Sequence, residues 1–186
     1  MNSYKALSKQ FFSENEYSII PIRFEDRLEI MQWRNEQMYH LRQTSLLTKE
    51  SQDRYFREVV FHQFKKENPE QILFSLLRDN ECIGYGGLVH INWVDKNAEL
   101  SFIMNTKLEM LEFSQLWMIF LRLIESPAFE ILDLHKIYTY AFDLRPALYP
   151  VLLDSGFKLE ACLKEHTFFD GKFVDVLIHS KFKKDA

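Results

Sequence analysis

The sequence predicts a mixed α/β fold with a mostly antiparallel sheet and helices on both faces. Segments with strand and helix patterns follow one another in the order β-α-α-β-β-β-α-β-α-β-β. Short turns at Asp79-Asn80 and at Asp170-Gly171-Lys172 join neighbouring strands, which favours antiparallel pairing. One long helical segment is apolar around most of its circumference, so it must be covered on several sides.

The first sixteen residues are expected to form a polar leader, followed by a single domain over residues 17–186. Asn2 to Glu16 is mostly polar, with one helical turn expected through Tyr4, Leu7 and Phe11. The remaining length is sufficient to bury a core without disulfides or metals. Seventeen phenylalanines and an apolar content of 47% predict an aromatic-rich interior.

The first half of the domain is expected to contain one strand, two helices and then three strands. Tyr17–Ile22 is a compact apolar strand, and Phe24–Met38 has helical spacing. A second helix begins after Thr48, whose hydroxyl can cap free backbone N–H groups, and ends at Asn68-Pro69. Its apolar face carries Tyr55, Phe56, Val59, Val60 and Phe64. The three strands follow at Ile72–Arg78, Glu81–Asn92 and Ala98–Asn105.

The second half begins with the strongest helical pattern of the chain, Leu108–Glu125. An apolar stripe runs along this helix and consists of Phe113, Leu116, Trp117, Phe120, Leu121 and Ile124. A strand at Ile137–Phe142 and a short helix at Pro146–Ser155 follow, and Gly156-Phe157 closes that helix. The last two strands are expected at Lys158–Phe169 and Phe173–Phe182.

Charge and cysteine content argue against several classes of function. The net charge is −4, from 23 basic and 27 acidic residues, and no basic tract favours nucleic acid or an anionic membrane as a partner. Cys82 and Cys162 lack metal or redox spacing, and the histidines lack metal-ligand spacing, so we expect buried, reduced thiols and no metal. No signal-peptide pattern stands at the start, which predicts a cytoplasmic protein.

Several short motifs, taken in their order and spacing, resemble the GNAT N-acetyltransferase superfamily. They are Trp33-Arg34-Asn35, Ile83-Gly84-Tyr85-Gly86-Gly87, Ala98-Glu99-Leu100-Ser101-Phe102-Ile103 and Gly156-Phe157. Within the superfamily, the chain looks closest to the branch that acetylates ribosomal-protein N-termini and sugar-nucleotide amines. The resemblance implies acetyl-CoA as the acetyl donor and a primary amine as the acceptor.

Glu99 is the residue that we expect to act as general base. Acyl transfer requires a neutral amine with a free lone pair, so a base must accept a proton from the ammonium group directly or through water. Strand periodicity puts Glu99, Ser101 and Ile103 on one face, where partial burial would raise the pKa of the carboxyl group. By resemblance, the backbone of Ile103, Met104 and Asn105 would bind the pantetheine arm. The alternative role for Glu99 is a strand carboxylate that bonds a neighbouring turn.

The general acid is harder to place. In the superfamily a tyrosine before Gly-Phe often protonates the departing thiolate, but that position holds Leu152, and Arg145 replaces the family's asparagine at the helix start. Tyr149 lies three residues earlier on nearly the same helix face, so it is our candidate acid. The alternative is a tyrosine packed in the core. Pro150 makes the geometry of this helix irregular.

The pyrophosphate-binding loop of the superfamily has lost its glycines. Met110 and Glu112 occupy their places, and Glu109 and Glu112 would repel a diphosphate. Either the pantetheine arm carries most of the affinity, with Lys107 and Arg145 meeting the phosphates from the side, or the chain has kept the fold and lost the cofactor.

The acceptor pocket is expected near Trp33, Arg34, His90 and Trp93. An arginine fork suits a phosphate, so Arg34 favours an amino-sugar nucleotide as the acceptor, with a protein N-terminus as the second choice. The alternatives are Trp33 in the core, Arg34 in a surface ion pair and His90 buried and hydrogen-bonded.

No nucleophilic Ser or Cys arrangement is visible, so we expect direct transfer in a ternary complex rather than through an acyl-enzyme. The expected function is therefore acetyl transfer to a small amine by a monomer or homodimer. The competing class is a non-catalytic module that binds a ligand or partner.

Overall fold

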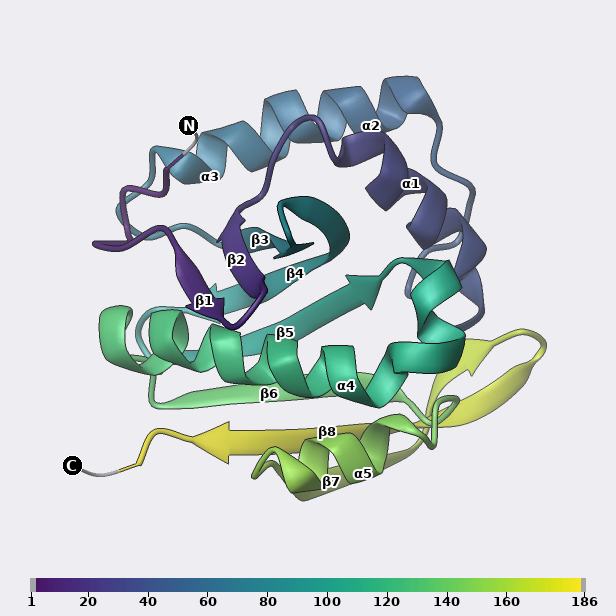
Figure 1. Cartoon of the computed structure of the whole chain (residues 1–186). Helices are drawn as coiled ribbons and strands as arrows, with labels where there is room; N and C mark the ends of the chain where they lie inside the picture. The colour runs from purple at the N-terminus through teal and green to yellow at the C-terminus, as the bar shows by residue number, and fades with distance from the viewer. Residues whose placement is uncertain (1–2, 185–186) are drawn as a thin grey trace.

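A computed structural model describes residues 3–184 of the chain. In this part of the chain, eight strands form one sheet in the order β1-β2-β3-β4-β5-β6-β8-β7. All neighbouring pairs are antiparallel except β5 and β6. Helices α1 and α2 lie on one side of the sheet, and α4 and α5 lie on the other (Figure 1). The predicted fold class is confirmed.

The strands of the structure follow the predicted order after one additional strand at the start. They are β1 (Phe12–Glu14), β2 (Tyr17–Pro21), β3 (Ile72–Arg78), β4 (Glu81–Asn92), β5 (Asn97–Met104), β6 (Lys136–Phe142), β7 (Lys158–Phe169) and β8 (Lys172–Phe182). The predicted bounds of β3, β4 and β7 are those of the structure. Asp79 and Asn80 join β3 to β4 with positive φ angles of 49° and 70°, which aspartate and asparagine tolerate.

The helical segments also occupy their predicted places. They are α1 (Arg27–Glu36), η1 (Met38–His40), α2 (Lys49–Tyr55), η2 (Phe56–Val60), α3 (Phe61–Phe64), α4 (Thr106–Glu125), η3 (Ser126–Ile131) and α5 (Leu148–Asp154). Thr48 caps α2 by accepting a hydrogen bond from the backbone N–H of Ser51. Tyr55 and Val59 are exposed although we expected them on the buried face. Val59 lies in η2, whose π-helical geometry rotates the apolar face.

Residues 3–16 pack against the domain and do not form the polar leader that we expected. Tyr4, Leu7 and Phe12 are buried in the main core, and Phe12 belongs to strand β1, which pairs with β2. The Tyr4 hydroxyl accepts a hydrogen bond from the backbone N–H of Leu73 at 2.8 Å and donates one to its carbonyl at 3.1 Å. Isolated apolar residues among polar ones provide no periodic signal, so the sequence pattern did not reveal this strand.

The two thiols differ from the expectation of buried cysteines. Cys82 is half-buried on β4, and Cys162 is exposed on β7. Strand β7 is an edge strand of the sheet and none of its residues is buried, so Cys162 faces solvent. Among residues 3–184, no helix is long and apolar enough to cross a membrane.

The most important feature of the sheet for function is a fork between β5 and β6. These parallel strands pair only at Asn97–Glu99 with Lys136–Tyr138. From Leu100 to Met104, β5 remains paired with β4 but has no partner on β6. The edge of β5 therefore presents free backbone groups to the gap, and a ligand with amide groups can pair with such an edge.

Candidate active site

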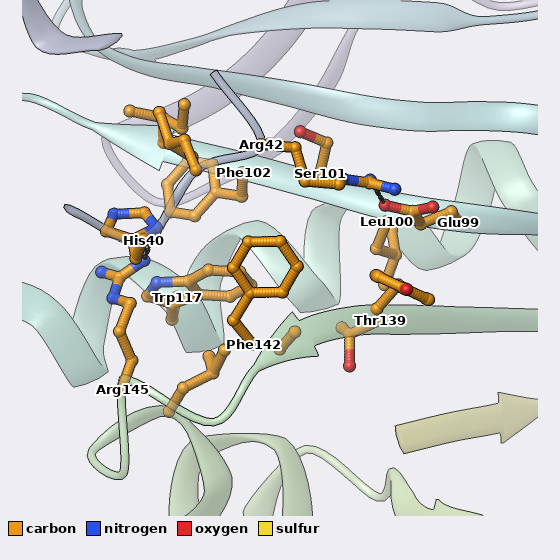
Figure 2. A pocket seen from close by; sticks show the side chains of 15 residues that line it. His40, Arg42, Glu99, Leu100, Ser101, Phe102, Trp117, Thr139, Phe142 and Arg145 are labelled. Atoms are coloured by element: carbon orange, nitrogen blue, oxygen red, sulfur yellow. Dashed lines mark hydrogen bonds and ion pairs between the residues drawn. The ribbon is translucent and has the colours of Figure 1, made fainter. Parts of the chain in front are cut away.

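A cavity occupies the gap between β5 and β6, and we call it the fork cavity. Its lining includes Glu99 and Ser101, which face the α1 side of the sheet, and Phe102 and Trp117, which lie on the α4 side. The cavity therefore extends through the sheet between the two strands. Figure 2 shows its lining side chains, with Glu99 at one end and Arg145 and His40 at the other.

Glu99 is buried, with 5% of its surface exposed, at the point where the fork opens. Arg42 donates a hydrogen bond to one carboxylate oxygen, and His90 Nε2 lies 3.9 Å from the other. Burial raises the pKa of Glu99, while the positive charge of Arg42 and the proximity of His90 act in the opposite direction. The result is a carboxylate with an elevated pKa, which suits a general base.

A second cavity, which we call the side cavity, meets the fork cavity at Ser101. Its lining combines polar and apolar side chains and comes from α1, the α2–α3 segment, the residues just before β3 and strands β3 to β5. Its polar groups come from Arg34, Tyr55, Gln63, Glu70, Gln71, Tyr85, His90 and Ser101. Because Ser101 lines both cavities and His90 lies beside Glu99, the carboxylate stands where the two cavities join. This arrangement can hold two ligands with their reacting groups next to one base.

Two of the four residues expected at the acceptor pocket line the side cavity, and two do not. Arg34 and His90 line the side cavity, and His90 is exposed rather than buried. Trp33 is 4% exposed and belongs to the core, and it does not line this cavity. Trp93 donates its indole N–H to the Pro69 carbonyl at 2.9 Å, and it too lies outside the cavity lining. Both tryptophans therefore make contacts within the fold and do not line the side cavity.

Arg34 has neutral hydrogen-bond partners. Its guanidinium donates to the Gln43 side-chain oxygen at 3.0 Å and to the Tyr85 hydroxyl at 2.7 Å. No carboxylate within residues 3–184 forms an ion pair with it. Since a half-buried cation without a counter-ion is costly, this guanidinium is available to an anionic group in the side cavity.

The residues expected to bind the donor lie along β5 and the start of α4. Ile103 lines the fork cavity. The Met104 carbonyl accepts a hydrogen bond from Gln37, and the Asn105 N–H bonds the Ile83 carbonyl, so these two backbone groups have internal partners. The Asn105 side chain caps α4 by accepting from the Lys107 N–H at 3.0 Å. The Lys107 side chain is exposed at the helix start.

Arg145 does line the fork cavity, at the end that lies next to the first turn of α4. It forms an ion pair with Glu109 at 2.5 Å and donates to His40 Nδ1 at 3.4 Å. Burial and the neighbouring charge of Arg145 lower the pKa of His40 to about 3, so its imidazole is neutral near pH 7.

Tyr149 does not suit the general-acid role for which we considered it. Its hydroxyl donates to Asp143 Oδ1 at 2.6 Å, and its ring stacks on that of His179. Tyr149 does not line the fork cavity, and burial together with Asp143 raises its pKa. A hydroxyl engaged with a carboxylate outside the cavity cannot donate to a group inside it.

Sequence reasoning missed three residues that shape the site: Arg42, His40 and Glu109. Arg42 and His40 come from the connection between α1 and α2, a segment without regular patterning. Glu109 was noted only as an obstacle to a diphosphate. The sequence around a charged residue does not indicate which distant residue it will pair with. These contacts can therefore be seen only in the folded structure.

A family model described as an acetyltransferase (GNAT) domain matches residues 19–178, which is most of the chain. The chain belongs to the GNAT acetyltransferase family. Acetyl-CoA is thus its co-substrate, and its activity is that of an acetyl-CoA-dependent N-acetyltransferase. The carboxylate at the junction of two cavities fits this activity, which we expected from the sequence in preference to a non-catalytic binding module.

Solved structures of GNAT acetyltransferases have the same fold. A spermidine N-acetyltransferase from Vibrio cholerae, solved in complex with CoA and spermine, matches with a TM-score of 0.77 and 20% identity over 91% of this chain and 97% of that one. The spermidine/spermine N-acetyltransferase SpeG from Vibrio cholerae, solved in complex with manganese ions, matches with a TM-score of 0.72 and 18% identity over 90% and 92%. No curated protein matches the sequence.

Proposed function

We propose that this acetyltransferase transfers acetyl directly from acetyl-CoA to the primary amine of a small acceptor, with both molecules bound at once. The observation that carries the proposal is the position of Glu99, where the fork cavity and the side cavity join. The fork cavity would hold the donor and the side cavity the acceptor. Holding the amine beside the thioester supplies much of the rate enhancement.

The fork cavity fits the pantetheine arm of the donor. The arm is extended and contains two amides, and the β5 edge from Leu100 to Met104 has no strand partner on its β6 side. Phe102 and Trp117 supply apolar contacts along the same cavity. Ile103 contributes to this edge, and Lys107 and Arg145 are the cationic groups at its far end. The residues present therefore fit acetyl-CoA without a glycine-rich loop.

Glu99 would act as the base for the acceptor amine. It accepts a proton from the bound amine, directly or through water, so that the nitrogen lone pair can attack the thioester carbonyl. A C–N bond forms, the C–S bond breaks, and the electron pair leaves on the sulfur of CoA. The raised pKa of Glu99 suits this role because a more basic carboxylate accepts a proton more readily.

The first acceptor class that we propose is an amine that also carries phosphate, such as an amino-sugar nucleotide. Arg34 supports this class because its guanidinium lines the side cavity without a carboxylate partner among the described residues. A polyamine is the second class, supported by the spermine complex of the structural neighbour. Its positive charges would meet Arg34 and Arg42, while Glu70 in the side cavity already pairs with Lys66.

The experiment combines titration calorimetry with an acceptor panel. Acetyl-CoA is expected to bind in the micromolar range, and mass spectrometry then identifies the product formed from an amino-sugar nucleotide, spermidine or a peptide with a free N-terminus. Absence of acetyl-CoA binding at millimolar concentration, together with no product from any amine, refutes the proposal. Arg34→Gln is expected to raise KM for the phosphorylated amine and to leave KM for spermidine unchanged.

Glu99→Gln tests the base. It should lower kcat by roughly 10²-fold or more, because the amide cannot accept the proton, while the acetyl-CoA Kd stays the same. Glu16→Gln, an exposed carboxylate in the β1–β2 turn, is the matched control and should leave kcat unchanged. An unchanged rate in Glu99→Gln would assign proton removal to water or to His90.

A further inference from the structure

A cluster of four side chains lies at the end of the fork cavity farthest from Glu99, and two of them, Arg145 and His40, line the cavity. Arg145 and Glu109 form its central ion pair at 2.5 Å. Tyr39 donates its hydroxyl to the same Glu109 oxygen at 3.0 Å, and Arg145 donates to His40 Nδ1 at 3.4 Å. Figure 2 shows Arg145 beside His40, separated from Glu99 by Phe102, Trp117 and Phe142.

The ion pair at the centre of this cluster is largely removed from water. Only 12% of the Arg145 side chain and 16% of the Glu109 side chain are exposed, and the Arg145 guanidinium lies 4.8 Å from the centre of the Phe113 ring. A buried guanidinium requires an anion, because its desolvation is otherwise uncompensated. An anion beside Arg145 therefore stabilises the folded chain.

The start of α4 offers few other groups to a phosphate. The Lys107 N–H bonds the Asn105 side chain, and the N–H groups of Leu108 and Glu109 bond the Asn105 carbonyl. Met110 and Glu112 stand where the family has glycines, and Glu112 forms an ion pair with Arg78 at 2.6 Å. Arg145 is the buried cation at this end of the cavity, so it is the group best placed for a charge-assisted bond to phosphate.

The shape of CoA brings its phosphates to this end. When the thioester lies beside Glu99, the pantetheine arm extends along β5 toward the start of α4, and the phosphates follow the arm. They would emerge next to Arg145, where Glu109 now supplies the negative charge. Glu109 and a CoA phosphate are thus alternative partners of one guanidinium.

We propose that Glu109 is a resident counter-ion that holds Arg145 at the phosphate end of the fork cavity until a phosphate of CoA replaces it. This inference rests on the proposed function, because it assigns the donor to the fork cavity. The exchange keeps Arg145 paired in both states, and it makes Glu109 a competitor that weakens donor binding. Glu109 and Arg145 are then positioning residues that determine affinity for phosphorylated donors.

The test measures the Kd of ligands with and without phosphate. Each variant replaces one charged side chain with glutamine. Glu109→Gln removes the competing anion, so the Kd of CoA should fall about tenfold. Arg145→Gln should raise that Kd at least tenfold. Pantetheine, which lacks phosphate, should bind all variants equally. Glu16→Gln is the control, since it removes one exposed negative charge in the β1–β2 turn, away from Arg145 and from the start of α4.

Inorganic pyrophosphate provides a readout that does not depend on acetyl transfer. Its Kd should change in the same directions as the Kd of CoA, even if no acceptor is ever acetylated, so failure of the acceptor panel and failure of this inference are distinguishable. Weaker or unchanged CoA and pyrophosphate binding in Glu109→Gln would overturn the inference. Equal changes for pantetheine and CoA would assign Glu109 a structural role instead.

Folding of each variant is checked by its thermal melting curve. If Arg145→Gln does not fold, Arg145→Lys replaces it, because lysine retains the charge but loses the two-pronged geometry of the guanidinium. This variant should still weaken CoA binding relative to pantetheine binding. Unchanged CoA affinity in Arg145→Lys, with pantetheine also unchanged, would overturn the phosphate role of Arg145.

Discussion

Arg42 donates a hydrogen bond to the carboxylate of Glu99 from the connection between α1 and α2, and its guanidinium also lies 5.0 Å from the centre of the Tyr140 ring. Nearly half of the Arg42 side chain is exposed, whereas that of Glu99 is 7% exposed. The base is therefore fixed inside the sheet, and its counter-ion can move into solvent. An acceptor ammonium entering from the side cavity would meet the same carboxylate.

Arg42→Gln should move the acid limb of the pH–rate profile to higher pH. Arg42 lowers the pKa of Glu99 against the larger effect of burial, so its removal leaves a carboxyl group that ionises at higher pH. Since the base must be ionised, kcat/KM should fall several-fold on the acid side and recover at alkaline pH. The control is Arg54→Gln on the exposed side of α2, and an unshifted profile in Arg42→Gln would contradict the pairing.

His40→Asn should make stability less sensitive to acid. The fold lowers the pKa of His40 from 6.5 to about 3, so between these values the unfolded chain binds a proton that the folded chain does not. The free energy of unfolding therefore decreases as pH falls through this range, and asparagine removes that contribution. Tm values measured from pH 4 to pH 8 check the expected flattening, with exposed His135→Asn as the control.

Gly86→Ala should destabilise the fold through the centre of the sheet. A Cβ atom at this position would lie 2.1 Å from the Ser101 carbonyl oxygen and 2.9 Å from the Phe120 ring, so the backbone of β4 or β5 must shift. We expect a loss of about 3 kcal/mol in the free energy of unfolding by urea titration.

Gly171→Ala is the matched control for Gly86→Ala. Its φ of +77° is strained for alanine, but a Cβ atom would meet nothing within 4 Å. The expected loss is about 1 kcal/mol. Equal losses of unfolding free energy in the two variants would show that contact with β5 is not the reason why position 86 disfavours a side chain.

Local patterns predicted much of the fold. The bounds of β3 and β4 follow from short, largely apolar runs and from the Asp79-Asn80 turn, whose residues tolerate positive φ. Thr48 marked the start of α2 for an equally local reason, since its hydroxyl caps the first turn. Strand β1 was missed because it has three residues, of which only Phe12 is buried, so it shows no local periodicity.

The candidate site, like the fold, could be predicted from the sequence only in part. Strand alternation identified Glu99 and its face of β5, and family motifs identified the kind of chemistry. Trp33 and Trp93 illustrate the limit, because an aromatic residue near a pocket in sequence can equally pack in the core or bond a nearby carbonyl. Only the packing around each side chain distinguishes these positions.

By itself, the sequence determined the order of strands and helices from β2 to β8, the family resemblance and the candidate base, because each depends on neighbouring residues or on short motifs. The tertiary structure decided which charges meet. Arg42 reaches Glu99 across 57 residues, and Arg145 reaches Glu109 across 36. The fork between β5 and β6 also emerged only in the fold, since the separation of two strands depends on the helices packed against them. Electrostatic pairing acts through space, so residues distant in sequence acquire partners only when the chain has folded.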